Sequence, residues 1–153
     1  MVRVDTLVKI SFPRKQKGAV AIEFALVFII FFAVFYGIVS YSLPLLLMQS
    51  FNQSTAEAVR RSVALDPTTA NYEAALKTRA KTELGLQLAW IPTALNFNVA
   101  TDASVTYVGG LLQVSIHYPS NKIGAVIPFL SLPGIGRVPN LPTTLTASSS
   151  LQF

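Results

Sequence analysis

The sequence predicts an α+β fold: a single N-terminal transmembrane helix extends into a helical region, and a small antiparallel β-sheet domain follows it. Three observations predict this fold. Residues 24–48 form an apolar run without a charged side chain. Residues 72–84 carry an apolar side chain at every fourth position, which is typical of a helix. Two segments within residues 104–118 alternate apolar and polar side chains, which is typical of strands.

The apolar run from Phe24 to Met48 is long enough to cross a bilayer. As a helix, its 25 residues would span about 37 Å, against a hydrocarbon core of about 30 Å. Pro44 lies inside the run and cannot donate to the carbonyl of Ser40, so we expect a kink or break there. The hydroxyls of Ser40 and Ser42 are available as substitute donors to that carbonyl.

The distribution of charge predicts the orientation of the span. Five of the twelve basic residues lie in the first 18 positions, and Arg14, Lys15 and Lys17 directly precede the run. The positive-inside rule therefore places the N-terminus in the cytoplasm and the C-terminal domain on the other side of the membrane. Because the charge forms a tail and not a face of the folded domain, we do not expect nucleic-acid binding.

These features divide the chain into a basic leader at 1–18, a transmembrane helix at 19–50 and an exported α+β domain at 51–153. A cleaved secretory signal is the ordinary alternative. The run is longer than the apolar core of a signal peptide, and no small-x-small site follows it. The one Ala-x-Ala sequence, at 19–21, precedes the run.

The exported part begins with helical patterns. Asp66 and Pro67 predict an N-cap and a first helical position. The helix that follows has an apolar stripe, with Ala75 beside it, made by Tyr72, Leu76, Ala80 and Leu84.

Gly109-Gly110 predicts a two-residue hairpin turn, because both positions of such a turn favour positive φ. Pairing Val108 with Leu111 sorts the two strands into one apolar and one polar face.

Alternation over 95–99 suggests an earlier strand, and alternation over 144–153 a last one. Residues 119–143 hold five prolines, which exclude a central strand. They form either a loop or short helix over the sheet, or an apolar patch that docks a partner or the membrane.

Few residues are suited to catalysis. The chain has no cysteine and one histidine, His117, which falls on the polar face of the hairpin. No metal-ligand spacing or phosphate-binding glycine motif is present. We therefore predict no enzyme activity, no cofactor and no metal site, and we interpret Trp90 as a core or interface anchor.

Glu23 stands out because it begins the apolar run, where an ionised carboxylate is costly without a partner. One interpretation places it in the headgroup layer near Lys17. The other follows from residues 17–26, KGAVAIEFAL, which resemble the processing region of type IV pilin-like proteins, most closely the TadE family of the tight-adherence (Flp) pilus system. Residues 56–64 are similar to the Ala/Arg-rich helix of that family.

The resemblance implies cleavage between Gly18 and Ala19 by a prepilin peptidase, which would leave Glu23 and Phe24 at the fifth and sixth positions of the mature chain. Cleavage creates an α-amino group that is cationic near neutral pH. By resemblance, Glu23 would pair with this amine on a neighbouring subunit and serve assembly. Gly18 is expected to keep the scissile backbone extended and unobstructed.

The function implied by the resemblance is that of a minor pseudopilin, a structural and assembly subunit of a Tad/Flp-type pilus or secretion machine. Its partners would be the prepilin peptidase, other pilin or pseudopilin subunits, an inner-membrane assembly platform and the lipid bilayer. Two alternatives stay open at this stage. One is an unprocessed bitopic scaffold with an exported interaction domain, and the other is a membrane-tethered enzyme.

Overall fold

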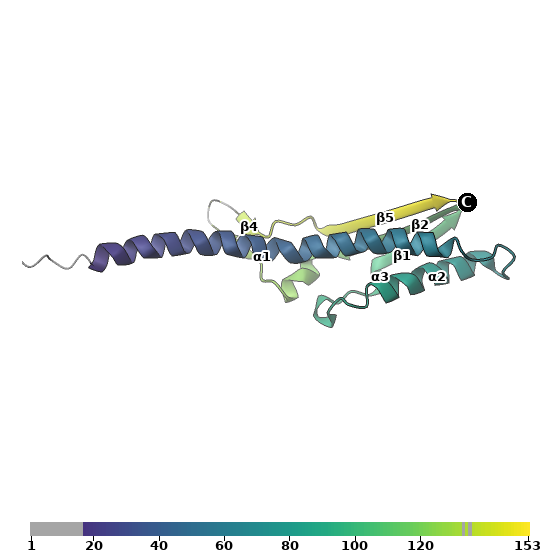
Figure 1. Ribbon diagram of the computed structural model, residues 1–153, viewed down its shortest axis with the longest axis horizontal. Helices are drawn as coiled ribbons and strands as arrows, with labels where there is room; N and C mark the ends of the chain where they lie inside the picture. The colour runs from purple at the N-terminus through teal and green to yellow at the C-terminus, as the bar shows by residue number, and fades with distance from the viewer. Residues whose placement is uncertain (1–16, 133, 135) are drawn as a thin grey trace, which may run out of the picture. The chain divides into compact units, whose positions relative to one another are not determined.

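The computed structural model describes residues 17–132, 134 and 136–153 (Figure 1). The predicted leader therefore lies almost wholly outside the described residues. In chain order, the elements are α1 (Lys17–Ser62), α2 (Tyr72–Gln87), the 3-10 helix η1 (Thr93–Leu95), α3 (Val99–Asp102), β1 (Ala103–Val108), β2 (Leu111–Pro119), the 3-10 helix η2 (Ser120–Ala125), β3 (Leu130–Leu132), β4 (Gly136–Val138) and β5 (Thr144–Gln152). A long apolar helix followed by a small antiparallel sheet confirms the α+β prediction.

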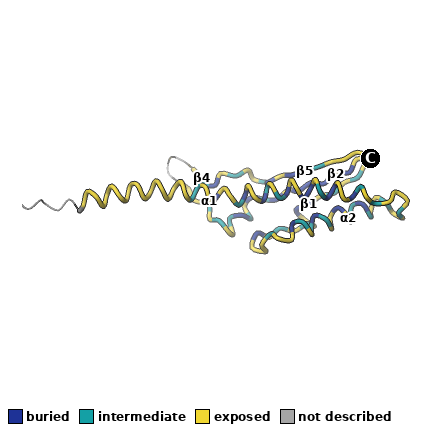
Figure 2. Tube along the Cα trace, viewed as in Figure 1, coloured by how far each residue is buried: buried dark blue, intermediate teal, exposed yellow. Residues whose placement is uncertain are grey.

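The chain forms two compact units, Met1–Tyr36 and Gly37–Phe153. In the first unit, every described residue of α1 from Gly18 to Phe35 is exposed (Figure 2). This part of the helix is apolar all round, apart from Glu23. An apolar helix that no described part of the chain covers is typical of a segment surrounded by lipid.

In the second unit, α1 buries one face only. The buried positions recur every three or four residues, at Ser40, Pro44, Leu47 and Phe51, and continue to the end of the helix. The protein domain therefore already covers one side of the apolar run before the run ends at Met48. Residues 18–39, of which only Tyr36 and Gly37 are half-buried, would span about 33 Å at about 1.5 Å per residue, which is enough for a hydrocarbon core.

Pro44 does not break the helix, since α1 continues through it to Ser62. The break that the sequence allowed is therefore wrong, and the kink stays a prediction. The serine hydroxyls also differ from the expectation. Ser40 donates to the carbonyl of Gly37 (3.0 Å) and Ser42 to that of Val39 (2.7 Å), so neither serves the carbonyl of Ser40.

The main sheet has the order β1-β2-β5 and is antiparallel throughout. Val108 pairs with Leu111, which confirms the predicted register, and both turn glycines have positive φ. The last strand is confirmed as β5. The core gathers side chains from α1, α2, β2 and β5, so the sheet and α2 enclose the buried face of α1.

The sequence was right about the stripe of α2 and wrong about its start. Leu76, Ala80 and Leu84 are buried as predicted. However, Asp66 does not cap the helix, because its carboxylate accepts bonds from the backbone and hydroxyl of Thr68 (2.9 and 2.8 Å). These bonds close a local turn, and α2 begins only after Asn71, which has positive φ.

The predicted strand at 95–99 is also wrong. Leu95 ends η1, and Asn96 takes a left-handed conformation that a strand cannot accommodate. The side chain of Asn98 then accepts a bond from the backbone of Ala100 (2.8 Å) and caps α3. An asparagine side chain that bonds nearby backbone competes with strand pairing. Here the bond of Asn98 favours a helical turn over the strand that the apolar alternation predicted.

Residues 119–143 contain more structure than either sequence interpretation allowed. The short helix is present as η2, and a second, two-stranded sheet follows, in which Leu130 pairs with Val138. Pro119 is the last residue of the central strand β2, where it pairs with Thr144, and Pro128, Pro139 and Pro142 lie outside the main sheet.

An ion pair and a tyrosine join the connecting segments to the core. Lys122 on η2 donates to both carboxylate oxygens of Asp102, at 2.8 Å each, and Asp102 is 5% exposed. The buried hydroxyl of Tyr118 donates to the carbonyl of Leu95 at 2.7 Å. Burial, with a smaller contribution from the charge of Asp102, raises the pKa of Tyr118 from 10.0 to about 12.

The raised pKa predicts alkaline destabilisation. The unfolded chain releases the phenolic proton near pH 10, whereas the folded chain holds it to about pH 12. Stability contributed by Tyr118 is therefore complete below pH 10 and is lost as the pH rises towards 12. Thermal unfolding of the full chain in detergent at stepped pH should show this loss. Tyr118→Phe should flatten it while lowering stability at neutral pH by about 1 kcal/mol, because the carbonyl of Leu95 loses its donor.

The two turn glycines should differ in their tolerance of alanine. Both have positive φ, so Gly109→Ala should cost about 1–2 kcal/mol. A Cβ on Gly110 would also lie 2.7 Å from the backbone oxygen of Phe153, whereas nothing lies within 4 Å of one on Gly109. Gly110→Ala should therefore cost at least about 1 kcal/mol more in the same unfolding assay. Equal losses would contradict the close approach of β5 to this turn.

Candidate functional site

The predicted cleavage site lies in the first turn of α1. Gly18 and Ala19 are both exposed, and a Cβ built on Gly18 would meet nothing within 4 Å. Among the described residues, nothing lies close enough to obstruct the junction. Its backbone is helical and not extended, because α1 already begins at Lys17. A peptidase that binds an extended chain would first have to unwind this turn, which is the least costly part of a helix to open.

Glu23 lies one turn further on and is exposed on the uncovered part of α1. Within the described part of the chain, no basic side chain lies within ion-pair distance of it. In a bilayer, such a carboxylate needs a partner from another molecule, from the headgroups or from outside the described residues. Because helical side chains lean towards the N-terminus, this carboxylate points towards the level of Ala19.

Phe24 begins a row of aromatic rings that the sequence interpretation did not single out. Along this row the ring centroids of Phe24 and Phe28 lie 6.0 Å apart, those of Phe28 and Phe32 6.3 Å, and those of Phe32 and Tyr36 6.4 Å. Successive members are four residues apart and so share one side of the helix. The spacing was visible in the sequence, but a continuous apolar run conceals any single stripe. Glu23 lies outside this row.

The other acidic side chains form structural contacts. Glu57 bonds Arg60 and Arg61 on α1, which lowers the pKa of its carboxyl, with Arg61 as the main cause. Glu73 pairs with Lys77, and Asp102 with Lys122. Glu83 contacts Arg61 as well, at 3.4 Å, so Glu57 and Glu83 share one guanidinium, whereas Glu73 and Asp102 each pair with a different lysine.

Two residues considered for other roles are on the surface. His117 is exposed on the polar side of β2, as predicted, and Trp90 is 44% exposed, so the core role proposed for it is wrong. Among the described residues, no three histidines or carboxylates are grouped so that they could hold a metal ion. The predictions of no catalysis and no cofactor stay predictions.

The arrangement defines a class of protein: an apolar helix long enough to cross a membrane, continuous with the core helix of a small α+β domain. Residues 18–60 of the chain match the family of TadE-like proteins. This match confirms the resemblance on which the sequence interpretation rested. It covers α1 from Gly18 to Arg60 and stops before α2. No curated protein and no solved structure matches the chain significantly.

Proposed function

We propose that the protein is a minor pseudopilin, a structural and assembly subunit of a Tad/Flp-type pilus or secretion machine. The observation that carries this proposal is Glu23: a carboxylate without a partner in the described chain, at the head of an uncovered apolar helix, inside the segment that matches TadE-like proteins. A carboxylate in that place is costly unless it forms an ion pair with a cation from another molecule. Assembly with other subunits provides such a cation.

In this proposal the helix inserts into the bacterial inner membrane with its basic leader in the cytoplasm and its domain on the periplasmic or extracellular side. The basic residues ahead of the span, Arg14, Lys15 and Lys17, support this orientation. A prepilin peptidase then removes residues 1–18, and an inner-membrane assembly platform receives the shortened chain together with other pilin or pseudopilin subunits.

Cleavage after Gly18 would free the α-amino group of Ala19. The carboxylate of Glu23 lies one helical turn away and leans towards that level of the helix. A neighbouring subunit at the same depth in the membrane would therefore present its amine close to this carboxylate. In the low dielectric of a bilayer, such a pair is worth more than it would be at a solvated surface.

One observation favours a second candidate, an unprocessed bitopic scaffold. The backbone at Gly18 is helical, and a peptide bond within a helix is a poorer protease substrate than an extended one. In this case the leader would stay attached, and the exported domain would act as an interaction module. The N-terminus of the protein in its own cells distinguishes the two candidates.

Mass spectrometry of the membrane-extracted protein should detect a chain that begins at Ala19. Gly18→Val should retain the leader, because a branched side chain obstructs the bond to be cut. Gly37→Val is the matched control. Gly37 is also a helical glycine, and a Cβ built on it would meet nothing within 4 Å, so this variant should be processed normally. A wild-type chain that begins at Met1 in cells containing the peptidase would contradict the pseudopilin proposal and support the scaffold.

Glu23→Gln should be processed normally but should reach sheared pili about tenfold less efficiently, because an amide cannot form the ion pair; a loss of about 1.4 kcal/mol gives this factor. Glu73→Gln is the control: it removes a carboxylate from α2, where the Glu73–Lys77 pair is exposed, and should change nothing. The measurement is the amount of protein in the pilus fraction relative to the membrane fraction. Unchanged incorporation of the Glu23 variant would refute the assembly role.

A further inference from the structure

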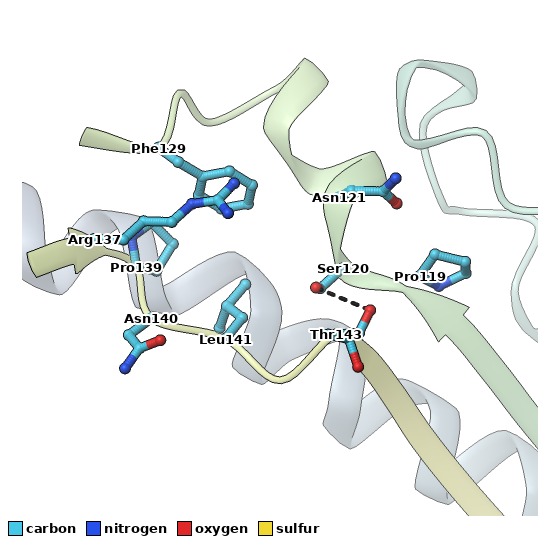
Figure 3. A pocket seen from close by; sticks show the side chains of 9 residues that line it. All are labelled: Pro119, Ser120, Asn121, Phe129, Arg137, Pro139, Asn140, Leu141 and Thr143. Carbon is cyan, nitrogen blue, oxygen red and sulfur yellow. Dashed lines mark hydrogen bonds between the residues drawn. The ribbon is translucent and has the colours of Figure 1, made fainter. Parts of the chain in front are cut away.

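A pocket of about 330 Å³ lies within the second unit, between the end of β2, η2, β4 and the segment that leads into β5 (Figure 3). Its volume is at the lower end of the range of about 300–1,000 Å³ common for small-molecule sites. Its lining combines one cation, several amides and hydroxyls, and several apolar side chains. The residues that the argument needs are Asn121, Phe129, Arg137, Pro139, Asn140 and Leu141.

Arg137 provides the charge of this pocket. Its guanidinium carbon lies 4.1 Å from the ring centroid of Phe129, so the cation is stacked on an aromatic face. Stacking fixes the plane of the guanidinium and leaves its N–H edge available for an oxygen ligand. No carboxylate lines the pocket, and within the described residues no carboxylate forms an ion pair with Arg137.

The remaining walls provide both polar and apolar contacts. Asn121 and Asn140 are exposed and carry side-chain amides that can donate to an anion. The hydroxyl of Ser120 is already bonded to the carbonyl of Thr143 at 3.1 Å, so it closes the wall (Figure 3). Pro139 is buried, and with Leu141 it forms an apolar side. Such a pocket suits a ligand that is anionic at one end and apolar at the other.

The position of the pocket along α1 identifies the source of that ligand. The hydroxyl of Tyr41 accepts a bond from the backbone of Asn140 at 2.8 Å, which fixes one wall of the pocket to α1. Tyr41 follows the apolar and mostly exposed stretch 18–39 almost directly. A bilayer surrounding that stretch would end near Tyr41, at the level where tyrosine is enriched in membrane proteins. Leu130 on β3 (37% exposed) and Val126 (45%) add apolar surface in the same segment.

We propose that this pocket binds the phosphate group of an anionic phospholipid from the leaflet on the domain's side of the membrane. The guanidinium of Arg137 would hold the phosphate oxygens, and Pro139 and Leu141 would contact the glycerol and the first carbons of the acyl chains. The lipid anchors the β3–β4 segment to the membrane surface. A free phosphate ion could bind the guanidinium through the same oxygens, but it would make no contact with the apolar side of the pocket.

The inference requires only that α1 lies in a bilayer. It depends on neither leader cleavage nor incorporation into a pilus, and it holds for either orientation of the span. Failure of the lipid site would therefore leave the pseudopilin proposal unaffected, and failure of that proposal would leave the lipid site standing.

The test is native mass spectrometry of the full-length protein in detergent, titrated separately with phosphatidylglycerol, phosphatidylethanolamine and inorganic phosphate. We expect one phosphatidylglycerol to bind wild-type protein at least about tenfold more tightly than Arg137→Gln, the factor that one lost charge-assisted contact of about 1.4 kcal/mol gives. Arg137→Lys should bind with intermediate affinity, because it keeps the charge without the planar fork. Circular dichroism should confirm that these variants are folded.

Lys81→Gln is the matched control, since it removes the same charge from an exposed position on α2 and should bind like wild type. Three results would overturn the proposal. They are equal binding by wild type and Arg137→Gln, an equal loss in Lys81→Gln, and displacement of the lipid by an equal concentration of inorganic phosphate. The last result would identify free phosphate as the ligand.

Discussion

The fold depends on the burial of one face of α1 beneath the domain. Up to Phe35 the helix exposes apolar side chains in every direction, Tyr36 and Gly37 are half-buried, and from Ser40 onwards one side is buried. Phe51 is the centre of that side. Its ring lies 5.5 Å from that of Phe97 and 5.7 Å from that of Tyr118, so it joins the helix to the segment before α3 and to β2. Burial of a side chain of this size contributes about 2–3 kcal/mol, and the sheet, η1 and α3 are all positioned around it.

The connecting segments are held in place by polar as well as apolar contacts. Leu95 on η1 and Ile123 on η2 belong to the buried core. Asp102, Lys122 and the hydroxyl of Tyr118 hold η1, α3 and η2 together by hydrogen bonds. Each of these buried or half-buried polar groups has its partner, so the contacts specify one arrangement of the connections without leaving an orphaned group.

Elements with a single strong periodicity were predictable from the sequence. The hairpin at Gly109-Gly110 and the stripe of α2 follow from the turn chemistry and from apolar spacing alone. The segments at 66–71 and 95–99 failed for a common reason: Asp66, Asn96 and Asn98 form local turns that apolar patterns do not register. In these two segments, local turn formation determined the backbone conformation and the apolar pattern did not.

The functional residues were likewise only partly predictable from the sequence. Glu23 was recognisable because an acid in an apolar run is conspicuous, and the motif around it matched TadE-like proteins. Arg137 was not recognisable, because its environment is built from η2, β4 and the segment before β5, and β4 is only three residues long. A pocket assembled from such separate short segments leaves no periodic trace in the sequence.

The small hydroxyl residues on the covered face of α1 have a consequence for how the chain enters a membrane. Ser40, Thr55 and Ser62 each donate to a carbonyl three or four residues earlier in the same helix. Their hydroxyl donors are therefore satisfied within the helix, whether or not the sheet is packed against it. Ser40 lies inside the apolar run, so that end of the covered face is compatible with hydrocarbon, whereas the charges of Glu57, Arg60 and Arg61 confine the other end to water.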